Sequence, residues 1–107
     1  MSEILARILD LVRADEVRIS AHGDDEIAED GILAGEVIDG VEAAAMIEEY
    51  PAYPKGSCVL VLQRDGRGNP IHVVWGIPRG RTSPAVLVTA YRPDPARWTE
   101  DYLRRRQ

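Results

Sequence analysis

Four residues have side chains that could carry out chemistry: His22, His72, Tyr91 and Arg92. An imidazole titrates close to neutral pH and can act as a general base or a general acid, whereas a guanidinium stays positively charged. Metal-independent RNA cleavage needs a base for the 2′-hydroxyl proton, an acid for the leaving oxygen and a cation beside the phosphate. The four residues are therefore candidate catalytic residues of a ribonuclease, provided that the fold brings them together.

The same residues also have a purely structural interpretation. His22 follows Ser20 at the expected start of a helix, where it could cap or pack, and His72 lies within an expected strand, where a carboxylate could bond it. Arg92 could pair with the acidic side chains of the helices. The sequence leaves this interpretation and the catalytic one open.

A metal site is a third, weaker possibility for this region. His22, Glu26 and Glu29 share one helical face because their spacing is four and three residues. Joined by His72, the group His22, Glu26 and His72 would give the imidazole and carboxylate ligands that zinc or manganese accepts. Acids in a first helical turn are also favoured by the helix dipole alone. We therefore expect no metal and no other cofactor.

Elements that must position these residues differ between the two halves of the chain. Helical spacing of apolar residues predicts helices over 3–13, about 22–30 and 33–44. Residues 17–20 read as a short extended segment. Runs rich in β-branched residues predict strands over 57–63, 71–77 and 85–91, with 47–50 as a further candidate strand. Turn-rich loops of seven residues, 64–70 and 78–84, permit only antiparallel neighbours. A short helix is predicted over 96–106.

The two halves also carry opposite charge. Residues 1–51 contain three Arg and fourteen Asp and Glu, whereas residues 52–107 contain ten Lys and Arg and four acids. The net charge is −5, which disfavours non-specific binding to nucleic acid. Basic residues in the second turn and at 104–106 would bind phosphate without sequence specificity. The simplest expectation is that the two halves neutralise each other within one fold.

Length and composition restrict the class of protein further. A chain of 107 residues is expected to form a single domain, 1–107. Cys58 is the only cysteine, so neither an internal disulfide nor a cysteine-based zinc site is possible, and an apolar run surrounds its thiol. No stretch is long enough to cross a membrane, and no signal peptide opens the chain. The expected location is the cytoplasm, with no membrane partner.

Several motifs occur in an order that resembles a known family. They are Ser20-Ala21-His22, Asp25-Glu26-Ile27-Ala28-Glu29-Asp30-Gly31-Ile32, Val37 through Glu48-Glu49-Tyr50-Pro51, Val59-Leu60-Val61-Leu62, Pro70-Ile71-His72-Val73-Val74, and Val88-Thr89-Ala90-Tyr91-Arg92-Pro93-Asp94-Pro95 with Trp98. Together they cover about residues 16–98 and resemble the domain-of-unknown-function family 4258. That family is similar in fold to the RelE-like and BrnT-like toxin ribonucleases of toxin–antitoxin pairs.

The resemblance implies an α+β fold in which N-terminal helices pack on a three- to four-stranded antiparallel sheet (RelE-like), followed by a short C-terminal helix. Many members have basic residues after the histidine, whereas this chain has Glu26 and Asp30, which indicates an acidic branch of the family. The loss of those charges argues against RNA binding.

Three functions follow from these observations. The first is a RelE-like domain with a binding or regulatory role and no catalysis, which the net acidity favours. The second is a metal-independent toxin ribonuclease that uses His22 and His72 with Tyr91 and Arg92. The third is a metal-dependent hydrolase. The expected partner is an antitoxin-like protein or a second copy of the chain, and RNA is disfavoured as a ligand by the net acidity.

Overall fold

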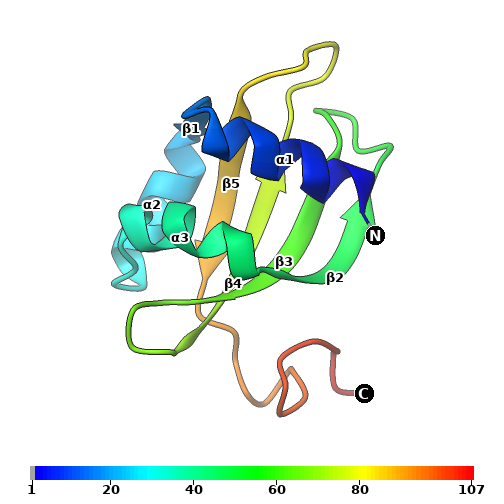
Figure 1. Cartoon of the computed structure of the whole chain (residues 1–107). Helices are drawn as coiled ribbons and strands as arrows, with labels where there is room; N and C mark the ends of the chain where they lie inside the picture. The colour runs from blue at the N-terminus through cyan, green and yellow to red at the C-terminus, as the bar shows by residue number, and fades with distance from the viewer. Residues whose placement is uncertain (1) are drawn as a thin grey trace.

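The computed structural model describes residues 2–107, which fold as helices on one face of a five-stranded sheet (Figure 1). The element order is α1 (Glu3–Arg13), β1 (Val17–Ile19), α2 (Ala21–Glu29), α3 (Ala34–Gly40), the short 3-10 helix η1 (Val41–Ala43), β2 (Ala45–Tyr50), β3 (Cys58–Arg64), β4 (Pro70–Gly76) and β5 (Ala85–Tyr91). The strand order is β1-β5-β4-β3-β2. The expected α+β fold is therefore confirmed.

The sheet is mixed rather than wholly antiparallel. Strands β2 to β5 form the expected antiparallel meander, and β2 contains the candidate strand at 47–50 and begins two residues earlier, at Ala45. The extended segment at Val17–Ile19 becomes a fifth strand, which pairs in parallel with β5. Because β1 has only three residues, its apolar pattern could not show that it joins a sheet.

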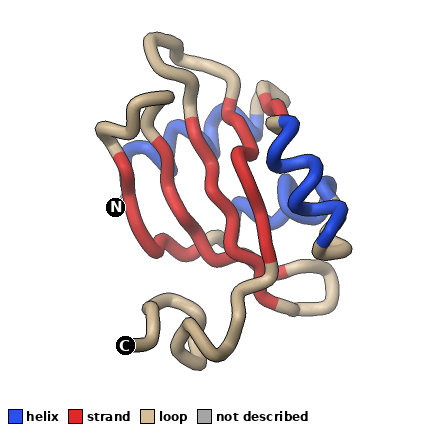
Figure 2. Tube along the Cα trace, turned by 180° about the vertical axis from the view of Figure 1, so that it is seen from behind, coloured by secondary structure: helices blue, strands red, loops and turns tan. Residues whose placement is uncertain are grey.

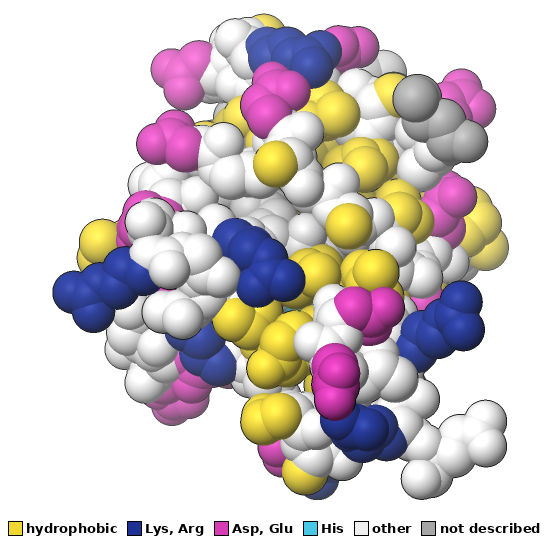
Figure 3. Space-filling view, turned by 60° about the horizontal axis from the view of Figure 1, so that its bottom comes forward, with side chains coloured by type: hydrophobic (Ala, Val, Ile, Leu, Met, Phe, Trp, Pro, Cys, Tyr) yellow, Lys and Arg dark blue, Asp and Glu magenta, His cyan; other side chains and the backbone are white. Residues whose placement is uncertain are grey.

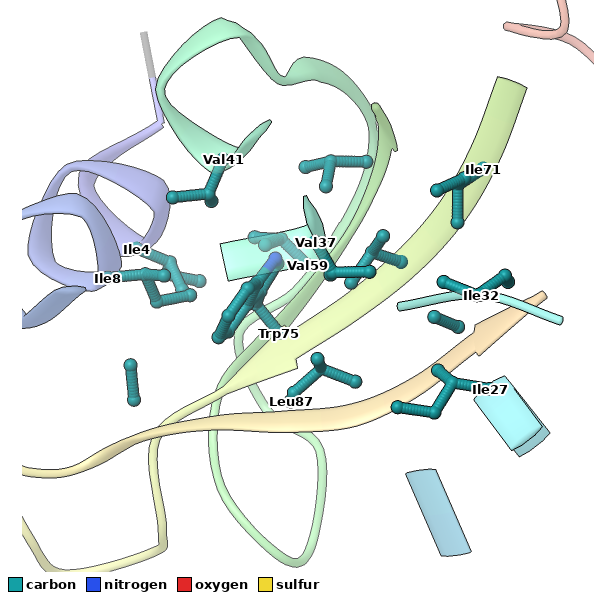
Figure 4. Close-up of a cluster of buried hydrophobic side chains, with 14 of the residues drawn as sticks. Ile4, Ile8, Ile27, Ile32, Val37, Val41, Val59, Ile71, Trp75 and Leu87 are labelled. Carbon is teal, nitrogen blue, oxygen red and sulfur yellow. The ribbon is translucent and has the colours of Figure 1, made fainter. Parts of the chain in front are cut away.

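The core lies between the helices and the inner face of the sheet (Figure 4). Ile4 and Ile8 of α1, Ile27 of α2 and Val37 of α3 reach it from the helical layer. The indole of Trp75, fully buried, lies at its centre. The apolar residues that recur at helical spacing in the first half of the chain pack here against the sheet. The helices bury their apolar faces in this way.

One buried polar link ties the sheet to the helices. The Gln63 side chain accepts a hydrogen bond from Trp75 Nε1 at 2.8 Å and donates one to the Val37 carbonyl at 2.7 Å. Gln63 is 2% exposed, so both of its polar atoms need such partners. The link fixes the end of α3 over strand β3.

Helix α2 approaches strand β5 unusually closely. A Cβ added to Gly23 would lie 2.9 Å from the carbonyl oxygens of both Leu87 and Val88. The register of β5 slips between its pairs with Val74 and Trp75, which leaves Val88 as a bulge. The freed Val88 carbonyl accepts a hydrogen bond from the Ser20 hydroxyl at 2.8 Å, and the Ser20 oxygen also caps α2 at Gly23 N.

The predicted C-terminal helix is wrong. Residues 94–107, called the C-terminal segment below, form turns and one isolated bridge between Trp98 and Arg105. The Thr99 hydroxyl bonds the Asp101 carboxylate at 2.6 Å, and that carboxylate accepts the Leu103 N–H at 3.0 Å. Such local side-chain bonds compete with a helix, and Tyr102 adopts a positive φ of 62°. Figure 2 shows this segment beyond the end of the sheet, as a chain without helix.

Charges of the two halves intermingle at the surface. On the face that Figure 3 brings forward, acidic and basic side chains alternate around apolar ones. The ion pair of Arg105 with Glu48 joins the basic half to the acidic half. Others stay within one half, as in Arg13 with Glu42 and Arg92 with Asp65. Mutual neutralisation between the halves is therefore only partial.

Candidate functional site

The outer face of the sheet is turned away from the helices (Figure 2), and it carries the candidate residues His72 and Tyr91. Side chains that pair across neighbouring strands point to the same face. Starting from His72, the pairs His72–Leu62, His72–Tyr91, Val74–Leu60 and Val74–Thr89 therefore lie on this face, and Gly76–Cys58 and Gly76–Val86 continue it. The face has two ends, one at His72 and the other at Gly76.

At the first end, His72 is held within a cluster formed by His72, Tyr91, Trp98 and Tyr102. Its Nε2 lies 2.8 Å from the Tyr102 carbonyl oxygen, which can only accept, so Nε2 carries the proton and donates. Its Nδ1 lies 3.3 Å from the Tyr91 hydroxyl, which donates to the ring when the imidazole is neutral. The Trp98 ring packs edge-on with its centroid 4.3 Å away.

Burial controls the ionisation of this cluster. His72 is 0% exposed, and desolvation lowers the pKa of its imidazole, an effect that the Tyr102 carbonyl partly opposes. Desolvation also raises the pKa of the Tyr91 phenol. Both groups are therefore neutral at neutral pH. This arrangement resembles the structural interpretation of His72, with a backbone carbonyl in place of the expected carboxylate.

The C-terminal segment closes this end of the face. Trp98 is 6% exposed, and Arg105 lies over its ring at 4.9 Å while also pairing with Glu48 of β2. Leu60 and Leu62, beside His72 in the register, are 3% and 7% exposed. The outer face is thus buried at this end by a segment that the sequence assigned to a helix.

Arg92 stabilises the loop between β3 and β4. Its guanidinium contacts the Asp65 carboxylate at 2.9 Å and the Pro70 carbonyl at 3.3 Å, and its backbone N–H donates to Asp30 at 2.9 Å. Hydrogen bonds from the backbone of Asn69 and Arg67 and from Arg92 lower the pKa of the Asp65 carboxyl. The side chain therefore pairs with a turn, and only its backbone reaches the acidic helix α2.

A hollow of about 670 Å³ lies beside Arg92 and Tyr91, and it is rich in arginine. Arg97, Arg105 and Arg106 also line it, together with Asp94. Most of its cations are engaged, because Arg105 binds Glu48 and the Nε of Arg106 donates to the Pro95 carbonyl. Most of the positive charge in this hollow is therefore already engaged by groups of the protein.

His22 lies at the other end of the outer face. It is in the first turn of α2, where its side chain is 68% exposed and its Nε2 lies 3.3 Å from the Glu26 carboxylate. The residues that contact His72, which are Tyr91, Trp98 and Tyr102, do not contact His22. Of the four candidate residues, the structure brings His72 and Tyr91 into contact. Arg92 follows Tyr91 in the chain and lines the same hollow. His22 lies apart from these three, in a separate hollow.

That second hollow is an open groove of about 630 Å³. Its floor is formed by the outer side chains of β3, β4 and β5, chiefly Cys58, Val74, Val86, Val88 and Thr89. Arg18, Ser20 and His22 line it from the β1–α2 side, and Tyr50, Tyr53, Lys55 and Gly56 from the β2–β3 side. This site was not foreseen from the sequence because its residues come from four separated segments, 18–22, 50–58, 74–78 and 86–89.

One wall of the open groove forms where the β2–β3 connection is hydrogen-bonded to residues 77–79, just after β4. The Ile77 N–H donates to Ser57 O at 3.0 Å, and the Arg79 N–H donates to Lys55 O at 2.9 Å. Gly56 has a φ of 133°, and a Cβ there would lie 2.0 Å from the Ile77 carbonyl oxygen. Only glycine permits this approach. Gly56 is therefore the one signal in the sequence that could have pointed to this wall.

The groove contains no activated nucleophile. Burial raises the pKa of the Cys58 thiol, so the sulfur is a neutral thiol at neutral pH rather than a reactive thiolate. Burial likewise raises the pKa of the Tyr50 phenol, whose hydroxyl donates to Glu48 at 2.8 Å. An apolar floor with neutral polar groups is suited to holding a ligand.

The side chains considered as metal ligands lie apart from one another in the structure. Across residues 2–107, no three His, Cys, Asp or Glu side chains lie close enough together to hold a metal ion. The structure therefore does not gather the weak candidates His22, Glu26 and His72 into one such group, because His72 is buried in the cluster with Tyr91 and Trp98. Within the same residues, no helix is long and apolar enough to cross a membrane.

The fold and the groove define a small α+β domain with a hollow on the outer face of its sheet. Comparison with protein families places it more narrowly: the profile described as "Domain of unknown function (DUF4258)" matches residues 19–92. The chain belongs to this family, and the match includes β2 to β5, His22, His72 and Arg92. No curated protein and no solved structure matches the chain.

Proposed function

We propose that this protein is a non-catalytic binding module and that its ligand occupies the open groove. What supports a binding role above all is the groove itself, an apolar hollow of about 630 Å³ with three edges supplied by loops and strand ends. Pockets for small molecules have volumes of roughly 300–1,000 Å³ and are lined mainly by apolar and aromatic groups. The groove has this size and this lining.

The contacts of the histidines favour the same conclusion. A general acid–base pair needs two groups that reach one substrate. Both nitrogens of His72 are occupied by Tyr102 and Tyr91, and His22 lines a groove to which neither His72 nor Tyr91 contributes. Arg92 is engaged by Asp65. These contacts support structural roles at the His72 end and leave the groove for binding.

A neutral fluorescent probe, N-phenyl-1-naphthylamine, tests the groove directly. We expect saturable binding to the wild-type chain, which Thr89→Trp abolishes because the indole fills the floor. Thr82→Trp is the matched control, since Thr82 is exposed in the β4–β5 connection and does not line the groove. Circular dichroism confirms folding of both variants. Equal binding by both variants, or no binding by the wild type, would contradict the proposal.

Incubation with single-stranded RNA tests the absence of catalysis. We expect intact RNA after incubation with the purified protein. Cleavage that is lost in either His72→Gln or Arg92→Gln, while His22→Gln retains it, would show a ribonuclease at the His72 end instead.

Sedimentation at several protein concentrations tests the other expected occupant of the groove, a second copy of the chain. A second copy that covered the groove would raise the measured mass and compete with the probe.

A further inference from the structure

The charge of the groove narrows the class of ligand. Its lining includes three groups that are or can become cationic, Arg18, His22 and Lys55, and it includes no carboxylate. This composition is unexpected in a chain with a net charge of −5. The neutral Cys58 thiol and Tyr50 phenol add no negative charge at neutral pH.

The two permanent cations are available to a ligand. None of the ion pairs among residues 2–107 involves Arg18 or Lys55, and both side chains are exposed. His22, by contrast, lies beside Glu26. The arginines of the other hollow differ in this respect, since three of them bind Asp65, Glu48 or the Pro95 carbonyl.

The fold places these cations on opposite sides of the apolar floor. Arg18 pairs with Val86 across the parallel β1–β5 register, so its side chain points to the outer face beside a floor residue. Lys55 belongs to the β2–β3 connection, whose position depends on the bond from Arg79 N and on Gly56. Charge thus surrounds a surface that is itself apolar.

We infer that the ligand of this groove is a small amphipathic anion, with an apolar body on the floor and an anionic group at the rim beside Arg18 or Lys55. This inference rests on the proposed binding function and adds the chemical class. A carboxylate, sulfonate or phosphate monoester would satisfy the cations, because each offers oxygens to a guanidinium or an ammonium. An extended polyanion is not expected, since the volume fits one small molecule.

A pair of probes separates the charge effect from the apolar effect. The anion 8-anilinonaphthalene-1-sulfonate has the ring system of N-phenyl-1-naphthylamine with one added sulfonate. We expect Arg18→Glu combined with Lys55→Glu to weaken binding of the anion at least about fivefold, because two attractive charges become repulsive. The neutral probe should lose affinity by a clearly smaller factor than the anion, because it carries no charge for the glutamates to repel. High salt should weaken binding of the anion only.

A matched control removes the effect of global charge. Arg7→Glu combined with Arg67→Glu changes the net charge by the same amount at exposed positions in α1 and the β3–β4 loop, outside the groove. We expect this variant to bind both probes as the wild type does. The inference is overturned if both double variants weaken the anion equally, or if neither does. Neutral binding that Thr89→Trp abolishes would then still support the proposed function, whereas its absence would overturn both.

Discussion

The two ends of the outer sheet face share the same strands but differ in what lies on them. At the His72 end, the C-terminal segment buries the face through Trp98 and the Tyr102 carbonyl, and most of the arginines are engaged by protein groups. At the Gly76 end, the face stays open as a groove, and Arg18 and Lys55 have no ion partner among residues 2–107. Histidine occurs at both ends, so residue type alone does not indicate function here.

The difference teaches that burial distinguishes a structural residue from a candidate binding residue in this fold. His72 has its hydrogen-bonding groups satisfied by the protein, as a buried polar group requires. His22 keeps most of its surface exposed at the rim of a hollow. The comparison can be tested by perturbing each end and measuring stability and probe binding separately.

The largest effect is expected from removing the indole that closes the His72 end. Trp98→Ala should lower the free energy of unfolding by about 3 kcal/mol, because it leaves a cavity against His72. Tyr53→Ala is the control at the open end, where the ring is 52% exposed and its loss should cost less than about 0.5 kcal/mol. Urea unfolding measures both. Equal costs would remove the distinction between a closed and an open end.

A smaller effect is expected from the ionisation of His72. Its folded-state pKa is lowered, so the unfolded chain binds more protons as the pH falls below the ordinary histidine value. Stability from this group is present above about pH 6.5 and is lost on acidification, by up to about 2 kcal/mol at about pH 5. The neutral Tyr91 phenol does not titrate in this window, and the lowered pKa values of Asp65 and Asp101 place their effects at lower pH.

Urea unfolding at several pH values measures this dependence. His72→Gln should flatten the change in unfolding free energy between about pH 5 and about pH 7.5, whereas His22→Gln, at the open end, should retain more of it. An NMR titration of the His72 ring in the wild-type chain gives a second reading if the variant folds poorly. A His72 pKa above its ordinary value would contradict the neutral, buried cluster.

The smallest effect is expected from the ion pair between Arg105 and Glu48. Arg105 is 58% exposed, and exposed pairs typically contribute 0–1 kcal/mol because solvent screens them. A double-mutant cycle with Arg105→Gln and Glu48→Gln should give a coupling of about 0.5 kcal/mol. Binding of both naphthalene probes to the Arg105→Gln variant should not change, because Arg105 does not line the groove. Altered probe binding would mean that the two ends of the face are coupled.

Much of the fold was predictable from local patterns. Ile4 and Ile8 recur at helical spacing, and α1 has the predicted bounds of 3–13. The β-branched runs and the turn residues between them correctly predicted three of the strands, and residues 47–50 provided the candidate fourth. The motifs led to the family that residues 19–92 confirm. In each case the signal lies within a few neighbouring residues.

What the tertiary structure decided involves groups that are distant in the chain. Val17–Ile19 became a strand only because β5 offered a free edge, and residues 94–107 lost their predicted helix as Trp98 and Tyr102 packed on His72. The groove needs Arg18, Lys55 and Val88 from separate segments. The sequence by itself determined which side chains were available and which local elements they form. Packing decided which of them are buried and which remain free to bind, because burial depends on contacts that no local pattern specifies.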